Sequence, residues 1–201
     1  MPINIEGNAF DDLRRLHARA VRDTVRLVAR VTPADLARPT PCAGWDLNDL
    51  LDHMTAQHHG FAAAAEGNGA DPAQWEVTDG GYGKAADRVL AAFAAVDDPD
   101  RPFALPEFGT GTTVKARRAL GFHLLDYVVH GWDVAHTLGI PYDPDPDVLD
   151  AALPIALAVP DGDFRRAPGS PFAPGLAAAA DASVLERILT MLGRRPADPA
   201  C

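Results

Sequence analysis

The chain contains the stretch Asp126-Tyr127-Val128-Val129-His130-Gly131-Trp132-Asp133, and upstream of it the stretch Thr40-Pro41-Cys42-Ala43-Gly44-Trp45-Asp46-Leu47-Asn48-Asp49-Leu50-Leu51-Asp52-His53. Asp126 and His130 are four residues apart, just over one helical turn, so both side chains project from the same face of a helix. A carboxylate and an imidazole placed in this way can hold one metal ion, and His53 offers a second imidazole from another segment. The two stretches therefore predict helices that carry a set of metal ligands.

The bulk composition bounds the class of protein. The chain has 201 residues, of which 47% are hydrophobic, and its mean hydropathy is −0.07. This is enough apolar material for a full core, so we expect one domain over residues 1–201. The formal net charge of −10 and the pI near 5.0 disfavour partners such as nucleic acid or an anionic membrane surface, because like charges repel.

The cysteines and the N-terminal segment bear on the cellular location. Cys42 and Cys201 form no CxxC pattern, so neither a disulfide framework nor a cysteine-based zinc site is predicted. The first residues lack a basic start followed by an apolar core, and no apolar run is long enough to span a bilayer. We therefore expect an unprocessed cytoplasmic protein.

Apolar residues recur at intervals of three and four, and no strand alternation of any length is present. Four long helices are predicted, from about Asn8 to Val31, from the cap Asp46 to the Gly67-Asn68-Gly69 stop, from about Asp79 to Val96, and from a Thr112 or Thr113 cap to Gly139. Shorter helices are predicted after Thr32-Pro33, from the Pro146 break to about Val159, and from Asp181 to Gly193. The fold class is all-α, a four-helix bundle with short accessory helices.

The fourth helix carries a narrow polar line within an arc of roughly 80°. The line consists of His123, Asp126, His130, Asp133 and Thr137. A strip that touches water would explain it, but the line contains no Lys, Arg or Glu, although other surface strips of the chain use these residues freely. A line made only of ligand-type side chains is better explained by an inward polar cavity.

The other candidate residues are interpreted as structural. We expect His17 at the surface, one of His58 and His59 packed and the other solvated, and His136 in a structural position pointing away from His130. Cys42 has no nearby basic motif, so a packing role is favoured over a nucleophilic one. Large aromatic side chains such as Trp45 and Trp132 are more often core residues than ligand-stacking ones.

The two motifs resemble the metal-binding domain of the mycothiol-dependent maleylpyruvate isomerases, within the wider DinB-like superfamily. The ending from Asp181 to Arg195 is also similar to the close of the short, single-domain actinobacterial branch of that family. The resemblance implies an up-down-down-up four-helix bundle with a divalent metal ion, usually zinc, at one end of the interhelical cleft. It covers nearly the whole chain, and its motifs are specific for the fold rather than for one reaction.

The same resemblance implies which residues bind the metal. The ligands of the family match His53, Asp126 and His130. The isomerase itself has Glu at the acidic position, so Asp126 is a shorter ligand that we expect to alter the geometry or weaken binding. His123 is a spare candidate that could replace or supplement Asp126. Asp133, one turn beyond His130, is the candidate catalytic residue, which could orient a ligand or accept a proton, and Thr137 is a weaker lining candidate.

The resemblance implies an enzyme that uses the metal to activate a thiol. The expected activity is transfer of mycothiol to a small electrophile, or an isomerisation, with the metal holding the cosubstrate sulfur as thiolate. The isomerase has a second domain, so conjugation or a tailoring step in secondary metabolism is expected here rather than maleylpyruvate isomerisation. The alternatives are a non-catalytic metal-binding or small-molecule-binding protein and a bundle that has lost its metal. A homodimer is expected by analogy.

Overall fold

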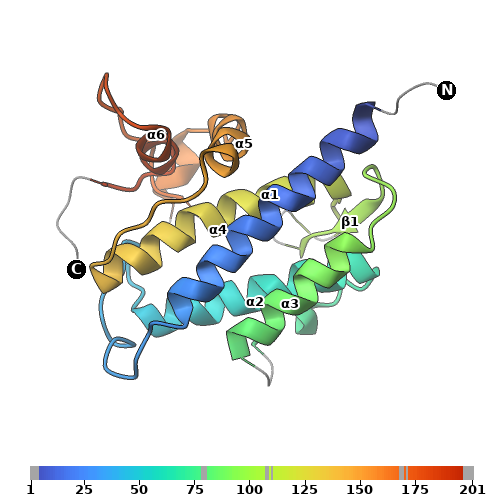
Figure 1. Cartoon of the computed structure of the whole chain (residues 1–201), viewed down its shortest axis with the longest axis horizontal. Helices are drawn as coiled ribbons and strands as arrows, with labels where there is room; N and C mark the ends of the chain where they lie inside the picture. The colour runs from blue at the N-terminus through green and yellow to red at the C-terminus, as the bar shows by residue number, and fades with distance from the viewer. Residues whose placement is uncertain are drawn as a thin grey trace.

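The structure is a computed structural model that describes residues 5–77, 81–106, 109, 111–167, 170 and 172–196. It confirms the all-α class (Figure 1). The helices are α1 Ile5–Val28, α2 Leu47–Glu66, α3 Gly81–Ala94, α4 Ala116–Leu138, α5 Pro146–Leu157 and α6 Val184–Met191, with 3-10 turns η1 Pro72–Trp75 and η3 Asp163–Arg166. A short antiparallel pair of strands, β1 Pro102–Ala104 and β2 Thr113–Lys115, was not predicted.

The four long helices form the up-down-down-up bundle that the family resemblance implies. α1 and α4 run in the same direction, since the ring of His17 meets that of His123 and, further along both helices, Thr24 lies against Gly131. α2 runs opposite to α4, because its residue Met54 accepts a hydrogen bond from the hydroxyl of Tyr127 while His58, later in α2, meets His123, earlier in α4. α2 and α3 lie side by side and run in parallel, joined by a crossover that includes η1 (Figure 1).

The ends of the central helices follow from local chemistry. Asp46 caps α2 in a capping box with Asp49, and Gly67 ends the helix in the left-handed conformation at φ 95°. Gly139 ends α4 in the same way at φ 67°. These three predictions are confirmed, and they fix where along the bundle the side chains of α2 and α4 stand.

Other predicted boundaries are wrong. Neither Thr112 nor Thr113 caps α4; Thr113 belongs to β2, and the helix starts at Ala116 without a side-chain cap because the strand pairing continues to Lys115. Ser183, not Asp181, caps α6, in a capping box with Glu186. After Thr32 the chain forms turns rather than a helix, because the carboxylate of Asp35 accepts both the backbone N–H and the hydroxyl of Thr32. Asp79, the predicted start of α3, lies outside the described residues, as does Cys201.

Burial explains why α4 has little amphipathic character. It is packed by α1, α2 and α5, and its apolar residues contribute to all three core clusters. Most of its polar line is buried as well, so the line faces the interior as predicted. Within the described residues, no helix has the length and apolar content needed to cross a membrane.

Candidate metal centre

Three side chains from two helices converge at one end of the bundle. His53 comes from α2, and Asp126 and His130 come from successive turns of α4; one ligand atom from each lies within 4.8 Å of the others. Nε2 of His130 is 3.3 Å from Oδ1 of Asp126. The ring of His53 meets that of His130 edge-on, with centroids 5.2 Å apart. The capping box of α2 and the four-residue spacing on α4 together produce this placement.

These three residues are protected from water to different degrees. His130 is 7% exposed, while His53 is half-buried and the side chain of Asp126 keeps 25% exposure. Burial lowers the pKa of His53, although the carboxylate of Asp126 opposes the shift. Burial acts to raise the pKa of Asp126, but the charge and hydrogen bond of His130 outweigh it and hold that pKa below its usual value. The site therefore favours an ionised Asp126 carboxylate and a His53 imidazole that is neutral at physiological pH.

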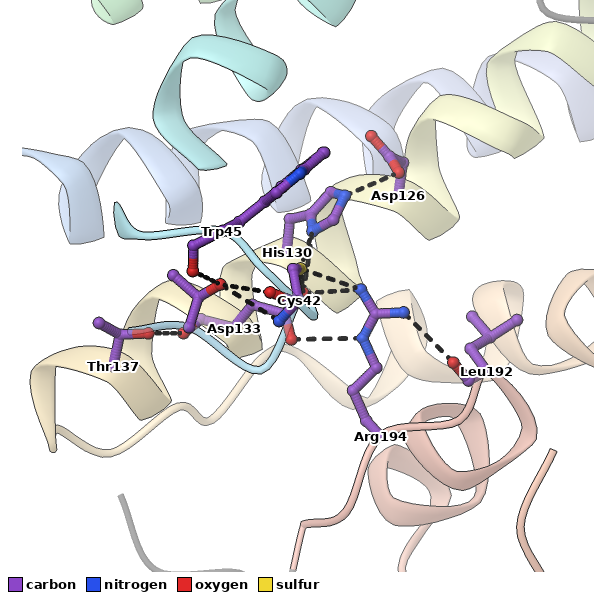
Figure 2. Close-up of polar contacts among 9 residues, drawn as sticks. Cys42, Trp45, Asp126, His130, Asp133, Thr137, Leu192 and Arg194 are labelled. Atoms are coloured by element: carbon purple, nitrogen blue, oxygen red, sulfur yellow. Dashed lines mark hydrogen bonds and ion pairs between the residues drawn. The ribbon is translucent and has the colours of Figure 1, made fainter. Parts of the chain in front are cut away.

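The other nitrogen of His130 faces a second group of polar side chains (Figure 2). Nδ1 of His130 lies 2.9 Å from Oδ2 of Asp133, which is fully buried. Arg194 reaches the same carboxylate from the segment after α6, with Nη2 2.9 Å from Oδ2 and Nε 3.3 Å from Oδ1. The thiol of Cys42 donates to Oδ2 of Asp133 at 3.3 Å. The contact with Asp133 orients the imidazole so that Nε2 points toward Asp126.

The charges in this second group balance one another. Burial alone would raise the pKa of Asp133, but the Arg194 guanidinium and His130 hold it well below its usual value. Burial would lower the pKa of His130, but Asp126 and Asp133 on its two sides raise it well above the ordinary range. Asp133 is therefore a buried anion with a matched cation, which is the condition under which a buried charge persists.

The donor set fits a divalent cation. Two imidazole nitrogens and a carboxylate are ligands that zinc accepts, and three protein ligands leave coordination positions for other molecules. Oδ2 of Asp126 is buried, yet it finds no hydrogen-bond partner among the described residues. Buried polar atoms nearly always have a hydrogen-bond partner, so this oxygen has an unused lone pair that a cation would accept.

Comparison with known proteins gives the family. Residues 17–135, more than half of the chain, match the mycothiol maleylpyruvate isomerase N-terminal domain. The chain belongs to this family. Two uncharacterized proteins from two strains of Mycobacterium tuberculosis are each 29% identical to it over 178 residues, which cover 89% of this chain and 95% of each relative. No solved structure matches the chain significantly.

The matched family segment contains all three converging residues and Asp133. It also contains His123, the spare ligand candidate, which the structure places elsewhere. His123 is fully buried deeper in the bundle, with its Nδ1 2.8 Å from Nε2 of His17 and its Nε2 3.3 Å from Nδ1 of His58. It does not join the ligand group formed by His53, Asp126 and His130.

Several expectations for single residues are wrong. His17 is 1% exposed rather than at the surface, because it pairs with His123 and packs against Phe93. His58 and His59 are both buried, at 0% and 8% exposure, so neither is the solvated member of the pair. The sequence did not show this because an arginine-rich helix face can still bury a polar residue that finds a partner on another helix.

The aromatic candidates divide between core and site. Trp132 is 9% exposed and packs against the ring of His136. Trp45 is 36% exposed, and the centroid of its ring is 5.0 Å from that of His53, so it stands beside the converging residues rather than in the core. Thr137 is fully buried and donates its hydroxyl to the backbone carbonyl of Asp133 at 2.9 Å, so it supports the helix and does not line the site.

Sequence reasoning missed Arg194 entirely and treated Cys42 as isolated. Cys42 has no basic residue near it in sequence, but Nη2 of Arg194, 152 residues away, lies 3.5 Å from its sulfur. Only the similarity of the final segment to the family could have drawn attention to Arg194. Its pairing with Asp133 depends on how α6 docks, which no local pattern encodes.

Proposed function

We propose that this protein is a divalent-metal-dependent enzyme that activates a low-molecular-weight thiol, mycothiol by analogy with its family, and directs it at a small electrophile. The observation that carries the proposal is the convergence of His53, Asp126 and His130 at one end of the bundle. The outcome for the electrophile is a thiol transfer or an isomerisation. The family membership supports the thiol, and the donor set supports zinc.

Each residue has a defined part in this proposal. His53, Asp126 and His130 would hold the cation, with Nε2 of His130 facing Asp126 and its Nδ1–H held by Asp133. A divalent cation bound there would deprotonate a coordinated thiol and so supply a nucleophile at neutral pH. Asp133 is enclosed by His130, Arg194 and Cys42, so its part is to orient His130 rather than to touch a substrate.

The exposed side of the site suits a small-molecule ligand. His53 is half-buried and Asp126 keeps a quarter of its side-chain exposure, so the ligand atoms are reachable from solvent. The indole of Trp45 lies beside His53 and offers an apolar surface against which an electrophile can pack. A low-molecular-weight thiol and a small electrophile are therefore the proposed partners.

The test combines metal analysis with a conjugation assay. Protein purified without a histidine tag is analysed for bound metal, together with His53→Ala, His130→Ala and the control His136→Ala. His136 is on the same helix as His130 but contacts Trp132 instead of the site. Each metal-loaded protein is then incubated with mycothiol and a chloronitrobenzene or monobromobimane, and the rate above the uncatalysed reaction is measured.

We expect about one metal ion for each parent and His136→Ala chain, and little in the other two variants. Conjugation above the uncatalysed rate should appear only in the proteins that bind the metal. Metal without any conjugation across a panel of thiols and electrophiles would favour the non-catalytic binding protein. Equal, negligible metal in all four proteins would remove the enzyme mechanism.

A further inference from the structure

His130 is shared by two groups of potential metal ligands. On its Nε2 side it meets His53 and Asp126, which we call the outer set. On its Nδ1 side it meets Cys42 and Asp133, which we call the inner set; its three ligand atoms also lie within 4.8 Å of one another. The inner set offers a thiol, which borderline and soft cations such as zinc and cobalt bind well. The types of ligand alone therefore give a metal ion no reason to bind the outer set in preference to the inner set.

The inner set already has a cation of its own. The guanidinium of Arg194 makes two contacts with the carboxylate of Asp133, at 2.9 Å and 3.3 Å, and one with the sulfur of Cys42 at 3.5 Å. Its third nitrogen donates to the carbonyl of Leu192 at 3.2 Å, which fixes the side chain against the end of α6. Arg194 is 8% exposed and Asp133 is fully buried, so the pair is shielded from solvent.

The same contacts determine which nitrogen of His130 is available. Nδ1 is 2.9 Å from Asp133 and 4.0 Å from the sulfur of Cys42, so its proton is held by the carboxylate. A histidine whose Nδ1–H is donated in this way presents Nε2 to a metal. Nε2 is on the side of Asp126, whose buried Oδ2 has no hydrogen-bond partner among the described residues.

We propose that Arg194 is a positioning residue that directs the metal to the outer set. Its guanidinium occupies the cation position of the inner set, holds Asp133 as the acceptor for Nδ1–H of His130, and so leaves Nε2 for the metal. The inference rests on the proposed function for the identity of the outer set as the working site. It adds that the segment after α6 controls that site, although α6 itself packs on α5 (Figure 1).

Loss of Arg194 has a specific consequence. The carboxylate of Asp133 would remain buried without the guanidinium that balances its charge, while the imidazole of His130 is shared with Asp126, and this loss is strongly unfavourable. A divalent cation can restore the balance, and Cys42, Asp133 and Nδ1 of His130 are already close enough to bind it. Arg194→Ala should therefore acquire a metal ion ligated by Cys42, and the affinity of the outer set should fall by about tenfold to a hundredfold, as for other losses of a ligand's supporting partner.

Cobalt(II) distinguishes the two sets by absorption. A cobalt ion bound by imidazole and carboxylate gives weak visible bands only, while a thiolate ligand adds strong charge-transfer absorption in the near ultraviolet. We expect the parent to show no thiolate band on titration with Co²⁺, Arg194→Ala to show one, and the double variant Cys42→Ser with Arg194→Ala to lose it. Arg195→Ala is the matched control, since Arg195 is the next residue and is exposed; it should behave as the parent.

Two results would overturn the inference. One is an Arg194→Ala protein, helical by circular dichroism, that shows no thiolate band. The other is a thiolate band in the parent, and this measurement holds even if Arg194→Ala does not fold. A parent that binds no cobalt at all would instead remove the proposed function. A thiolate band gained only in Arg194→Ala would, in that case, still support the inference that Arg194 keeps metal out of the inner set.

Discussion

Nε2 of His17 on α1 lies 2.8 Å from Nδ1 of His123 on α4, in the middle of the bundle. Nε2 of His123 in turn lies 3.3 Å from Nδ1 of His58 on α2, so three helices are linked through a chain of imidazoles. All three side chains are at most 1% exposed. Burial lowers the pKa of His17 to about 3 and those of His58 and His123 well below the usual value, so the three rings are neutral in the folded protein.

The imidazole chain should make the fold sensitive to mild acid. These histidines take up protons near pH 6.5 in the unfolded state. In the folded state His17 does so only at about pH 3, and His58 and His123 only well below pH 6.5, so the unfolded state binds more protons below pH 6.5. Stability should therefore fall as the pH drops below 6.5, by on the order of 1 kcal/mol per pH unit for each histidine. Urea unfolding at pH 6.5, 5.75 and 5.0 measures this slope above the range in which most carboxylates titrate.

His123→Gln should flatten the slope, whatever it does to the stability at pH 6.5, because it removes one of the buried imidazoles. His136→Gln is the control, since His136 does not belong to the three linked imidazoles, and this variant should keep the pH slope of the parent. His130 adds little to this slope well below pH 6.5, because its raised pKa keeps it protonated in the folded state and the unfolded imidazole is protonated there as well. A parent protein with constant stability from pH 6.5 to 5.0 would contradict the neutral assignment.

Asp126 should be required for metal affinity through its charge. Asp126→Asn keeps the size of the side chain but removes the anion. Zinc affinity should therefore fall by at least about tenfold, because even the loss of a residue that only hydrogen-bonds a metal ligand has an effect of this size. Asp126→Glu keeps the carboxylate and should retain more binding. Competition with a chromophoric chelator gives the dissociation constants, and Asp87→Asn, an exposed change on α3, should leave them unaltered. Equal affinity in parent and Asp126→Asn would exclude this residue as a ligand.

Metal binding should also raise thermal stability. A cation that binds only the folded state adds about 3 kcal/mol at a hundred times its dissociation constant. Zinc should therefore increase the Tm of the parent in a concentration-dependent way, and a chelator should reverse the increase. His53→Ala should show no such response, whereas His136→Ala should respond like the parent. Differential scanning fluorimetry suffices for all three proteins.

Gly60→Ala should destabilise the helix that carries His53. A Cβ at this position would lie 2.1 Å from two ring atoms of Trp75, so the indole would have to leave its place against Phe61 and lose its hydrogen bond to the carbonyl of Gly69. The expected loss is about 1–3 kcal/mol in chemical unfolding. Gly83→Ala is the matched control, because a Cβ there meets nothing within 4 Å and alanine favours a helix. It should be neutral or stabilising.

The sequence was sufficient for features that depend on local chemistry. The cap at Asp46, the stop at Gly67 and the end of α4 at Gly139 are set by residues a few positions apart, and all three were predicted. The facing of Asp126 and His130 follows from helical spacing alone. The approach of His53 to them needed the family resemblance, since periodicity says which face is buried but not which helix it meets.

The features that failed depend on contacts distant in sequence. His17 looked exposed among arginines, yet a partner 106 residues away accounts for its burial. Arg194 lies 61 residues from the carboxylate it neutralises, and nothing around either residue marks the pair. The start of α4 was misplaced because strand pairing with β1 claimed Thr113, and that pairing is formed by two segments with no alternating pattern.

Arg194 also has a bearing on biosynthesis. Asp133 emerges from the ribosome well before residue 194, so the four long helices can meet while this carboxylate still lacks its guanidinium. Until the segment after α6 docks, this carboxylate therefore lacks the guanidinium that balances its charge, and the contacts with His130 and Cys42 remain to hold it.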